Sequence, residues 1–198
     1  MLKTSYEGWE FTHRVLWQIV RDQAAIARDR DRDWRNPSLV AMVFAFHAVE
    51  AYVNFAGEQL APEIWKDERN FFRNEPYRGW EGKVRKVLEL ADLPWSSSVP
   101  PLKTVLDLKA LRDVIAHGKS ERFEGTILHP DMDDIPYPVS KLWSMVTPKE
   151  KLPILLGDVE TFIAQIHERL APRVGDHFFK ASALGGPTWY VSRNTSAT

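Results

Sequence analysis

The sequence LRDVIAHGK, residues 111–119, contains residue types that acid–base chemistry beside an anion requires. Lys109, Asp113 and His117 follow one another at intervals of four, so on a helix they lie on one face. A carboxylate one turn before a histidine can bond the imidazole and favour its protonated form. Arg112 projects about 140° away from His117 on the same geometry, and its guanidinium offers paired donors to phosphate oxygens. We call these residues the Arg112 motif.

The Arg112 motif also has a purely structural interpretation. Helix C-termini favour His and Lys because the helix dipole is negative there, and Gly118 is a typical residue after a helix end. Residue types alone leave both interpretations open.

A second set of polar residues interrupts the apolar segment 37–60. Its members recur every three or four residues and form one narrow stripe: His47, Glu50, Asn54 and Glu58. The stripe can be the solvent-facing edge of a nearly buried helix. Alternatively, it faces the Arg112 motif across a cleft between helices, so that His47, Glu50 and Asn54 line the same pocket.

Composition excludes several chemistries. The chain has 198 residues, 26 Lys+Arg against 27 Asp+Glu, and no cysteine. Disulfides, thiolate zinc sites and cysteine nucleophiles are therefore excluded, and the near-neutral balance gives no global attraction for nucleic acid. The six histidines are scattered, and the acidic loop at 129–134 lacks the ligand order of a calcium loop. We expect no metal and no cofactor.

Apolar spacing predicts an all-α bundle of about five helices. The predicted helices cover residues 4–30, 37–60, 79–92, 100–117 and 148–170. Residues 120–146 lose the helical period, and their flanks, FEGTIL and PVSKLWSMV, are expected to pair as a small β-hairpin insertion. The sequence Thr147-Pro148-Lys149-Glu150 is a capping box that predicts the start of the last helix.

The predicted organisation is a single helical domain at 1–175 and an irregular C-terminal tail at 176–198. No apolar run approaches the roughly 20 residues of a membrane span, and the N-terminus lacks the apolar core of a signal peptide. We therefore expect a cytoplasmic protein with no membrane partner.

The segment LKALRDVIAHGK resembles the Arg-x4-His signature of HEPN domains (higher eukaryotes and prokaryotes nucleotide-binding). Arg112 matches the arginine, Asp113 the polar residue after it, His117 the histidine and Gly118 the glycine. The segment AFHAVEAYVNFAGEQL is similar to the second helix of the family, with Glu50 and Asn54 at its polar positions. The resemblance covers the order of helices from about 4 to 170.

This resemblance implies a four- to five-helix bundle that commonly forms a homodimer, in which two Arg-x4-His motifs meet in a cleft. Many members are metal-independent endoribonucleases of toxin–antitoxin, abortive-infection and RNA-processing systems, and some have an antitoxin protein as partner. Arg112, Asp113 and His117 are then the expected catalytic residues, while Lys109 and Lys119 add positive potential for single-stranded RNA. The alternative is a catalytically inactive module that binds a nucleotide or a partner protein through the same cleft.

Overall fold

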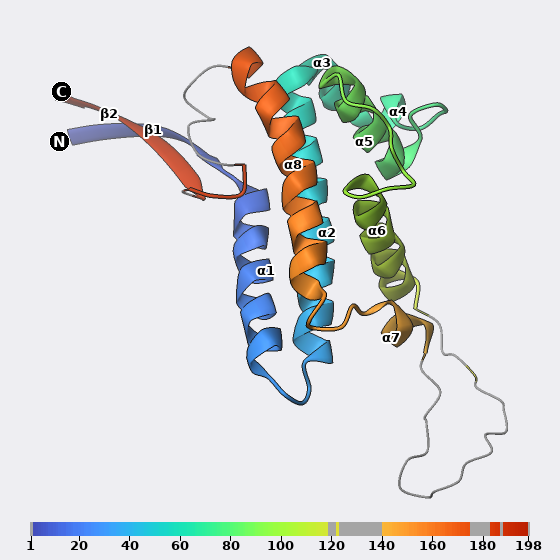
Figure 1. Ribbon diagram of the computed structural model, residues 1–198. Helices are drawn as coiled ribbons and strands as arrows, with labels where there is room; N and C mark the ends of the chain where they lie inside the picture. Colours follow the sequence, from blue (N-terminus) through green and yellow to red (C-terminus); the bar gives the residue numbers. More distant parts are fainter. Residues whose placement is uncertain (1, 119–121, 123–139, 175–182, 187, 198) are drawn as a thin grey trace, which may run out of the picture.

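The computed structural model describes residues 2–118, 122, 140–174, 183–186 and 188–197, and over these ranges the chain is mainly helical (Figure 1). The eight helices of these ranges are α1 (Thr12–Asp29), α2 (Arg35–Leu60), α3 (Pro62–Lys66), α4 (Glu68–Phe71), α5 (Gly79–Leu90), α6 (Leu102–Ala116), α7 (Lys141–Met145) and α8 (Leu152–Val174). The helical character agrees with the predicted all-α class. The predicted number of about five was too low, because α3, α4 and α7 have only four or five residues, too few to show a helical period.

Helix α2 is the centre of the bundle. It packs against α1, α3, α5, α6 and α8, and Figure 1 shows α1 on one side of it, α5 and α6 on the other, and α8 in front of it. Phe46, Val49 and Tyr52 are completely buried along it. With 26 residues and a mean hydropathy of 1.6, α2 is the one described helix long and apolar enough to cross a membrane, whereas the sequence predicted none; a buried core helix has the same composition.

The other long helices present one apolar face each to this centre. Helix α1 is strongly amphipathic and buries Trp17 and Val20. Helix α8 buries Val159, Phe162 and Ile166. It begins at Leu152, four residues after the predicted start at 148, because the chain first makes a turn in which the Lys151 and Leu152 amides donate to the Pro148 carbonyl.

The two ends of the chain form a two-stranded antiparallel sheet, which corrects two predictions. Strand β1 (Leu2–Glu10) pairs with β2 (Trp189–Ala197), in a register that runs from Leu2 opposite Ala197 to Glu10 opposite Trp189. Residues 4–10 are therefore not helical, and the tail at 176–198 is not irregular throughout. A strand depends on a hydrogen-bonded partner, and here the partner lies at the far end of the chain, where local spacing cannot show it.

The insertion at 120–146 also differs from its prediction where it is described. Residues 141–145, expected in one arm of a hairpin, form α7, and the Ser140 side chain accepts a hydrogen bond from the Trp143 amide at 3.3 Å. A serine that caps an amide three residues later favours a helix start over a strand. The other arm, FEGTIL, lies outside the described residues.

Candidate functional site

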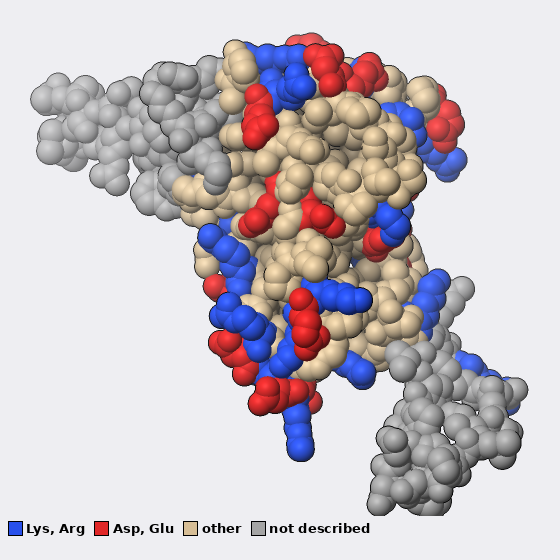
Figure 2. Space-filling view, in the orientation of Figure 1, with Lys and Arg blue, Asp and Glu red and all other residues tan. Residues whose placement is uncertain are grey.

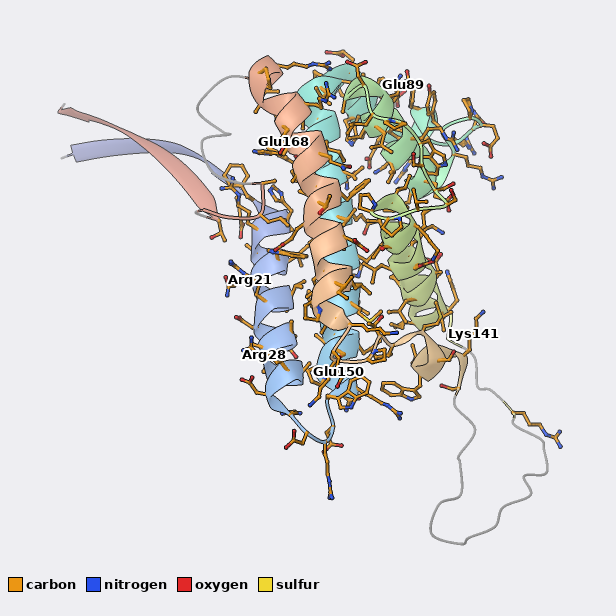
Figure 3. The ribbon with its side chains drawn as sticks, viewed as in Figure 1. Arg21, Arg28, Glu89, Lys141, Glu150 and Glu168 are labelled. Carbon is orange, nitrogen blue, oxygen red and sulfur yellow. The ribbon has the colours of Figure 1, made fainter. Side chains whose placement is uncertain are left out.

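Helix α6 positions the Arg112 motif by its buried face. Leu102, Val105, Leu108 and Leu111 hold it against the bundle. The helix ends at Ala116, and the His117 amide still donates to the Asp113 carbonyl at 3.0 Å. The end of α6 lies next to α7, which Lys141 marks in Figure 3, while Glu89 marks α5 beyond the other end. His117 is the residue directly after this helix end, and its side chain is exposed.

Asp113 is held by two cations on its own helix. One carboxylate oxygen, Oδ2, accepts from Lys109 Nζ at 2.8 Å, and the other, Oδ1, accepts from Arg112 Nη1 at 3.0 Å. The hydrogen bond from Lys109 lowers the pKa of Asp113, and the same bond raises the pKa of Lys109. Both pKa shifts favour the charged forms of Asp113 and Lys109.

Arg112 leaves α6 and reaches α2. Its Nη2 lies 3.6 Å from Glu50 Oε1, and its guanidinium lies over the Phe46 ring with 5.2 Å to the centroid. Glu50 Oε2 in turn lies 3.3 Å from Nδ1 of His47. The predicted meeting of the α2 stripe with the motif is thus present for His47 and Glu50. The Phe46 face and the Glu50 carboxylate explain how a half-buried guanidinium is tolerated beside the core.

One member of this group could not be found from the sequence. Glu81 of α5 lies 3.5 Å from Lys109 Nζ and extends the ion pairs to a third helix. We call the set the Arg112 network: His47, Glu50, Glu81, Lys109, Arg112 and Asp113. No local spacing links Glu81 to α6, so only the packing of α5 against the bundle reveals it.

Asn54 belongs to a different cluster, one turn further along α2. Its Oδ1 accepts from Lys83 Nζ at 3.0 Å and from Trp65 Nε1 at 3.5 Å. Lys83 also pairs with Glu68 at 2.6 Å. Asn54 therefore stabilises the junction of α2 with α3, α4 and α5, and the structure shows it bonded to these residues rather than to Arg112.

The expected bond between Asp113 and His117 is not formed. Both Asp113 oxygens are taken by Lys109 and Arg112, whose positive charges bind a carboxylate more strongly than a neutral imidazole does. Among the residues that the structure describes, His117 has no side-chain hydrogen bond or ion pair. Lys119 and the acidic loop at 129–134 lie outside them.

The Arg112 network contains more acidic than basic side chains within one chain. It holds three carboxylates and two cations, and positive and negative side chains also mix on the face shown in Figure 2. A cavity of about 370 Å³ opens beside Lys109, where Arg78, Arg85 and Trp80 are among its lining residues. Within the described ranges no group of three or more His, Asp or Glu side chains could hold a metal ion.

A second group of polar side chains is buried between α1, α2 and α8. The His13 ring lies 5.3 Å from that of Tyr52, and the Tyr52 hydroxyl lies 3.2 Å from Nδ1 of His167. Arg14 Nε lies 3.5 Å from the Ala183 carbonyl. We call His13, Arg14, Tyr52 and His167 the His13 cluster.

Burial governs the pKa values of the His13 cluster. Desolvation lowers the pKa of His13 to about 4, with the Arg14 charge as a second cause. It also lowers the pKa of Arg14 and raises that of Tyr52 well above its usual range. All three shifts favour the neutral form, as expected where charge is removed from water.

Fold and site together define a mainly helical bundle with an exposed histidine at one helix end and an ion-pair network beside it. Comparison of the chain with family models, with curated proteins and with solved structures found no match in any of the three.

Proposed function

We propose that this protein is a metal-independent endoribonuclease of the HEPN type, which cleaves single-stranded RNA as a cytoplasmic homodimer in a toxin or phage-defence system. The observation that carries the proposal is the exposed imidazole of His117 at the end of α6, close in sequence to an arginine that Glu50 and Phe46 hold in place. The resemblance of residues 108–119 to the Arg-x4-His signature supports it.

The chemistry needs a base, an acid and a cation. His117 accepts the proton of the RNA 2′-hydroxyl as its oxygen attacks the adjacent phosphorus. The bond from phosphorus to the 5′-oxygen breaks, and the leaving oxygen takes a proton from His117 of the partner subunit. The products are a 2′,3′-cyclic phosphate and a 5′-hydroxyl, so no metal is required.

Arg112 supplies the cation for the charge that develops on phosphorus. Its contact with Glu50 is 3.6 Å, longer than a hydrogen bond, so an RNA phosphate can take over these donors without breaking a strong bond. Asp113 fixes the guanidinium of Arg112 by accepting the 3.0 Å hydrogen bond from its Nη1. Its role is to position Arg112, in place of the predicted role of orienting His117.

A second candidate function, that of a catalytically inactive binding module, is favoured by the excess of carboxylates in the Arg112 network. A ribonuclease needs a positive groove for RNA, whereas this network has more carboxylates than cations in a single chain. A catalytically inactive module that binds a nucleotide or a partner protein, such as an antitoxin, needs no such groove. The cavity at Arg78, Arg85 and Lys109 has the size of a small-ligand pocket.

The decisive experiment incubates the protein with mixed single-stranded RNA in excess EDTA and identifies the new ends. We expect cleavage that leaves 2′,3′-cyclic phosphates. His117→Ala should reduce the rate by about 10²–10⁴, the usual cost of one acid–base group. Arg28→Ala, a change at an exposed cation of α1, is the matched control and should cleave normally. An inactive wild type, or a fully active His117→Ala variant, favours the binding module.

The homodimer is tested independently of activity. Sedimentation at micromolar concentration should give a mass near twice 22.8 kDa. Because the proposed acid comes from a second chain, a strict monomer removes the composite site and also favours the binding module.

A further inference from the structure

A cleft of about 460 Å³ lies between α6 and α8, with residues of α2 and α7 in its walls. Three of its four α6 residues, Thr104, Asp107 and Leu108, point away from the face that carries Lys109 and Asp113, by the geometry of the helix. The cleft is therefore separate from the Arg112 network. Its volume is in the range of small-molecule sites.

The walls of this cleft are apolar and reach the core. The apolar lining consists of Met42, Leu108, Ala110, Met145, Ile154 and Leu155. Leu108 is 1% exposed and Met42 3%, so the floor is formed by core side chains. The two methionines give it an adaptable surface, since a thioether chain fits ligands of different shape.

One carboxylate of the cleft, that of Asp158, has a hydroxyl rather than a described cation as its partner. It lies half-buried on α8 and accepts a hydrogen bond from the Thr104 hydroxyl at 2.6 Å. No Lys or Arg in the described ranges pairs with it. Asp107, the other acid of the lining, is already neutralised by Lys103 at 2.5 Å. A carboxylate that borders apolar walls gains most from a cation that brings apolar surface with it.

Lys151, the basic residue in the lining, forms no ion pair with Asp158. It directly precedes α8 and comes seven residues before Asp158, which corresponds to about 10 Å along a helix. Its side chain is exposed, and Ile154 and Leu155 of the apolar lining lie between the two residues in sequence. The lining therefore combines the Asp158 carboxylate, apolar side chains and an exposed lysine.

We propose that this cleft is a binding site for a small amphipathic amine. The protonated amine bonds Asp158 and a lone pair of the Thr104 hydroxyl, while the apolar body lies against Leu108, Leu155 and Met42. A carboxylate analogue of the same shape is rejected, because its charge would face Asp158. The site is independent of the RNA chemistry proposed above.

The test is an NMR titration of the ¹⁵N-labelled full chain with 3-phenylpropylamine, with 3-phenylpropionate as the matched probe of opposite charge. We expect saturable shifts from the amine at amides of α6 and α8 around Thr104 and Asp158, and at least tenfold weaker binding of the acid. Equal binding of the two probes, or shifts confined to another surface, would overturn the proposal.

Two variants sharpen the test. Asp158→Asn should weaken the amine at least tenfold, whereas Asp22→Asn, a change at an exposed carboxylate of α1, should leave it unaffected. Ala110→Phe places a ring in the cleft from an exposed helix position and should block the amine without disturbing the core. If Ala110→Phe instead alters the sedimentation mass and leaves amine binding intact, the cleft is a contact between copies and the proposal is wrong.

Discussion

The Arg112 network and the His13 cluster both join α2 to neighbouring helices through histidine and arginine, yet their environments are opposite. The side chains of Arg112 and Glu50 are each 31% exposed, whereas His13 is 2% exposed and Arg14 5%. In the exposed network each cation has a carboxylate partner. In the buried cluster the partners shown are aromatic rings, a hydroxyl and a backbone carbonyl.

The pKa shifts follow this difference. Pairing lowers the pKa of Asp113 and raises that of Lys109, so both move toward the charged form. Burial lowers the pKa of His13 and of Arg14, so both move toward the neutral form. The comparison shows that the environment of ionisable side chains, whether paired at the surface or buried, decides which protonation state is favoured. In the exposed network pairing favours the charged forms of Asp113 and Lys109, whereas burial of His13 makes the stability of the bundle depend on pH.

The largest expected effect is a difference in unfolding free energy between two histidine-to-alanine variants. His13→Ala should lower the free energy of unfolding by about 3 kcal/mol, because it removes a buried ring that packs on Tyr52 and Phe55. His117→Ala should change it by no more than about 0.5 kcal/mol, since that side chain is exposed. Urea unfolding at pH 7.5 measures both. Equal losses would show that the two histidines do not differ as their burial indicates.

The next effect is the pH dependence of stability. The pKa of His13 is about 4 in the folded protein, against 6.5 for an exposed histidine such as that of the unfolded chain. Between pH 6.5 and pH 4 the unfolded chain therefore binds more protons than the folded protein. The contribution of neutral His13 to stability is fully present above pH 6.5 and is lost as the pH decreases toward 4. The full loss is about 3 kcal/mol. His13→Phe removes this titration, and its unfolding curves should depend less on pH than those of wild type; parallel curves would contradict the assignment.

A smaller loss is expected from Tyr52→Phe. The change deletes the hydroxyl that lies 3.2 Å from His167 and leaves a buried ring nitrogen without that partner. About 1–2 kcal/mol of unfolding free energy should be lost, with little change in packing volume. The matched control is Tyr77→Phe, whose hydroxyl donates to Glu89 at the surface, and this change should lower the free energy of unfolding less than Tyr52→Phe does.

The smallest effect is expected in the Arg112 network. Glu50→Gln removes an ion pair of 3.6 Å between partly exposed groups, which should cost at most about 1 kcal/mol. The difference from wild type should shrink in 1 M NaCl, where the screening length is about 3 Å. A loss that persists in high salt would place Glu50 in a desolvated environment like that of the His13 cluster.

Much of the fold could be predicted from local spacing, because an α-helix fixes which residues share a face. The apolar periods located the five long helices within four residues at each end, apart from the first eight residues (4–11) assigned to the first helix. The same geometry placed Lys109 and Asp113 one turn apart, and the structure shows them bonded at 2.8 Å. Of the two interpretations that the sequence left open for the polar stripe of α2, the one in which it faces the motif holds for Glu50, which contacts Arg112, and for His47, which contacts Glu50.

Tertiary structure decided the rest, because the competing partners lie on other elements. The four-residue spacing suggested a bond between Asp113 and His117, but Lys109 and Arg112 donate to both carboxylate oxygens of Asp113. Asn54 bonds Lys83 of α5 instead of joining Arg112, and β1 pairs with a strand from the far end of the chain. The burial that shifts the pKa of His13 likewise comes from packing with α2 and α8. Local geometry sets which contacts are possible, and only the packed bundle decides which of them form.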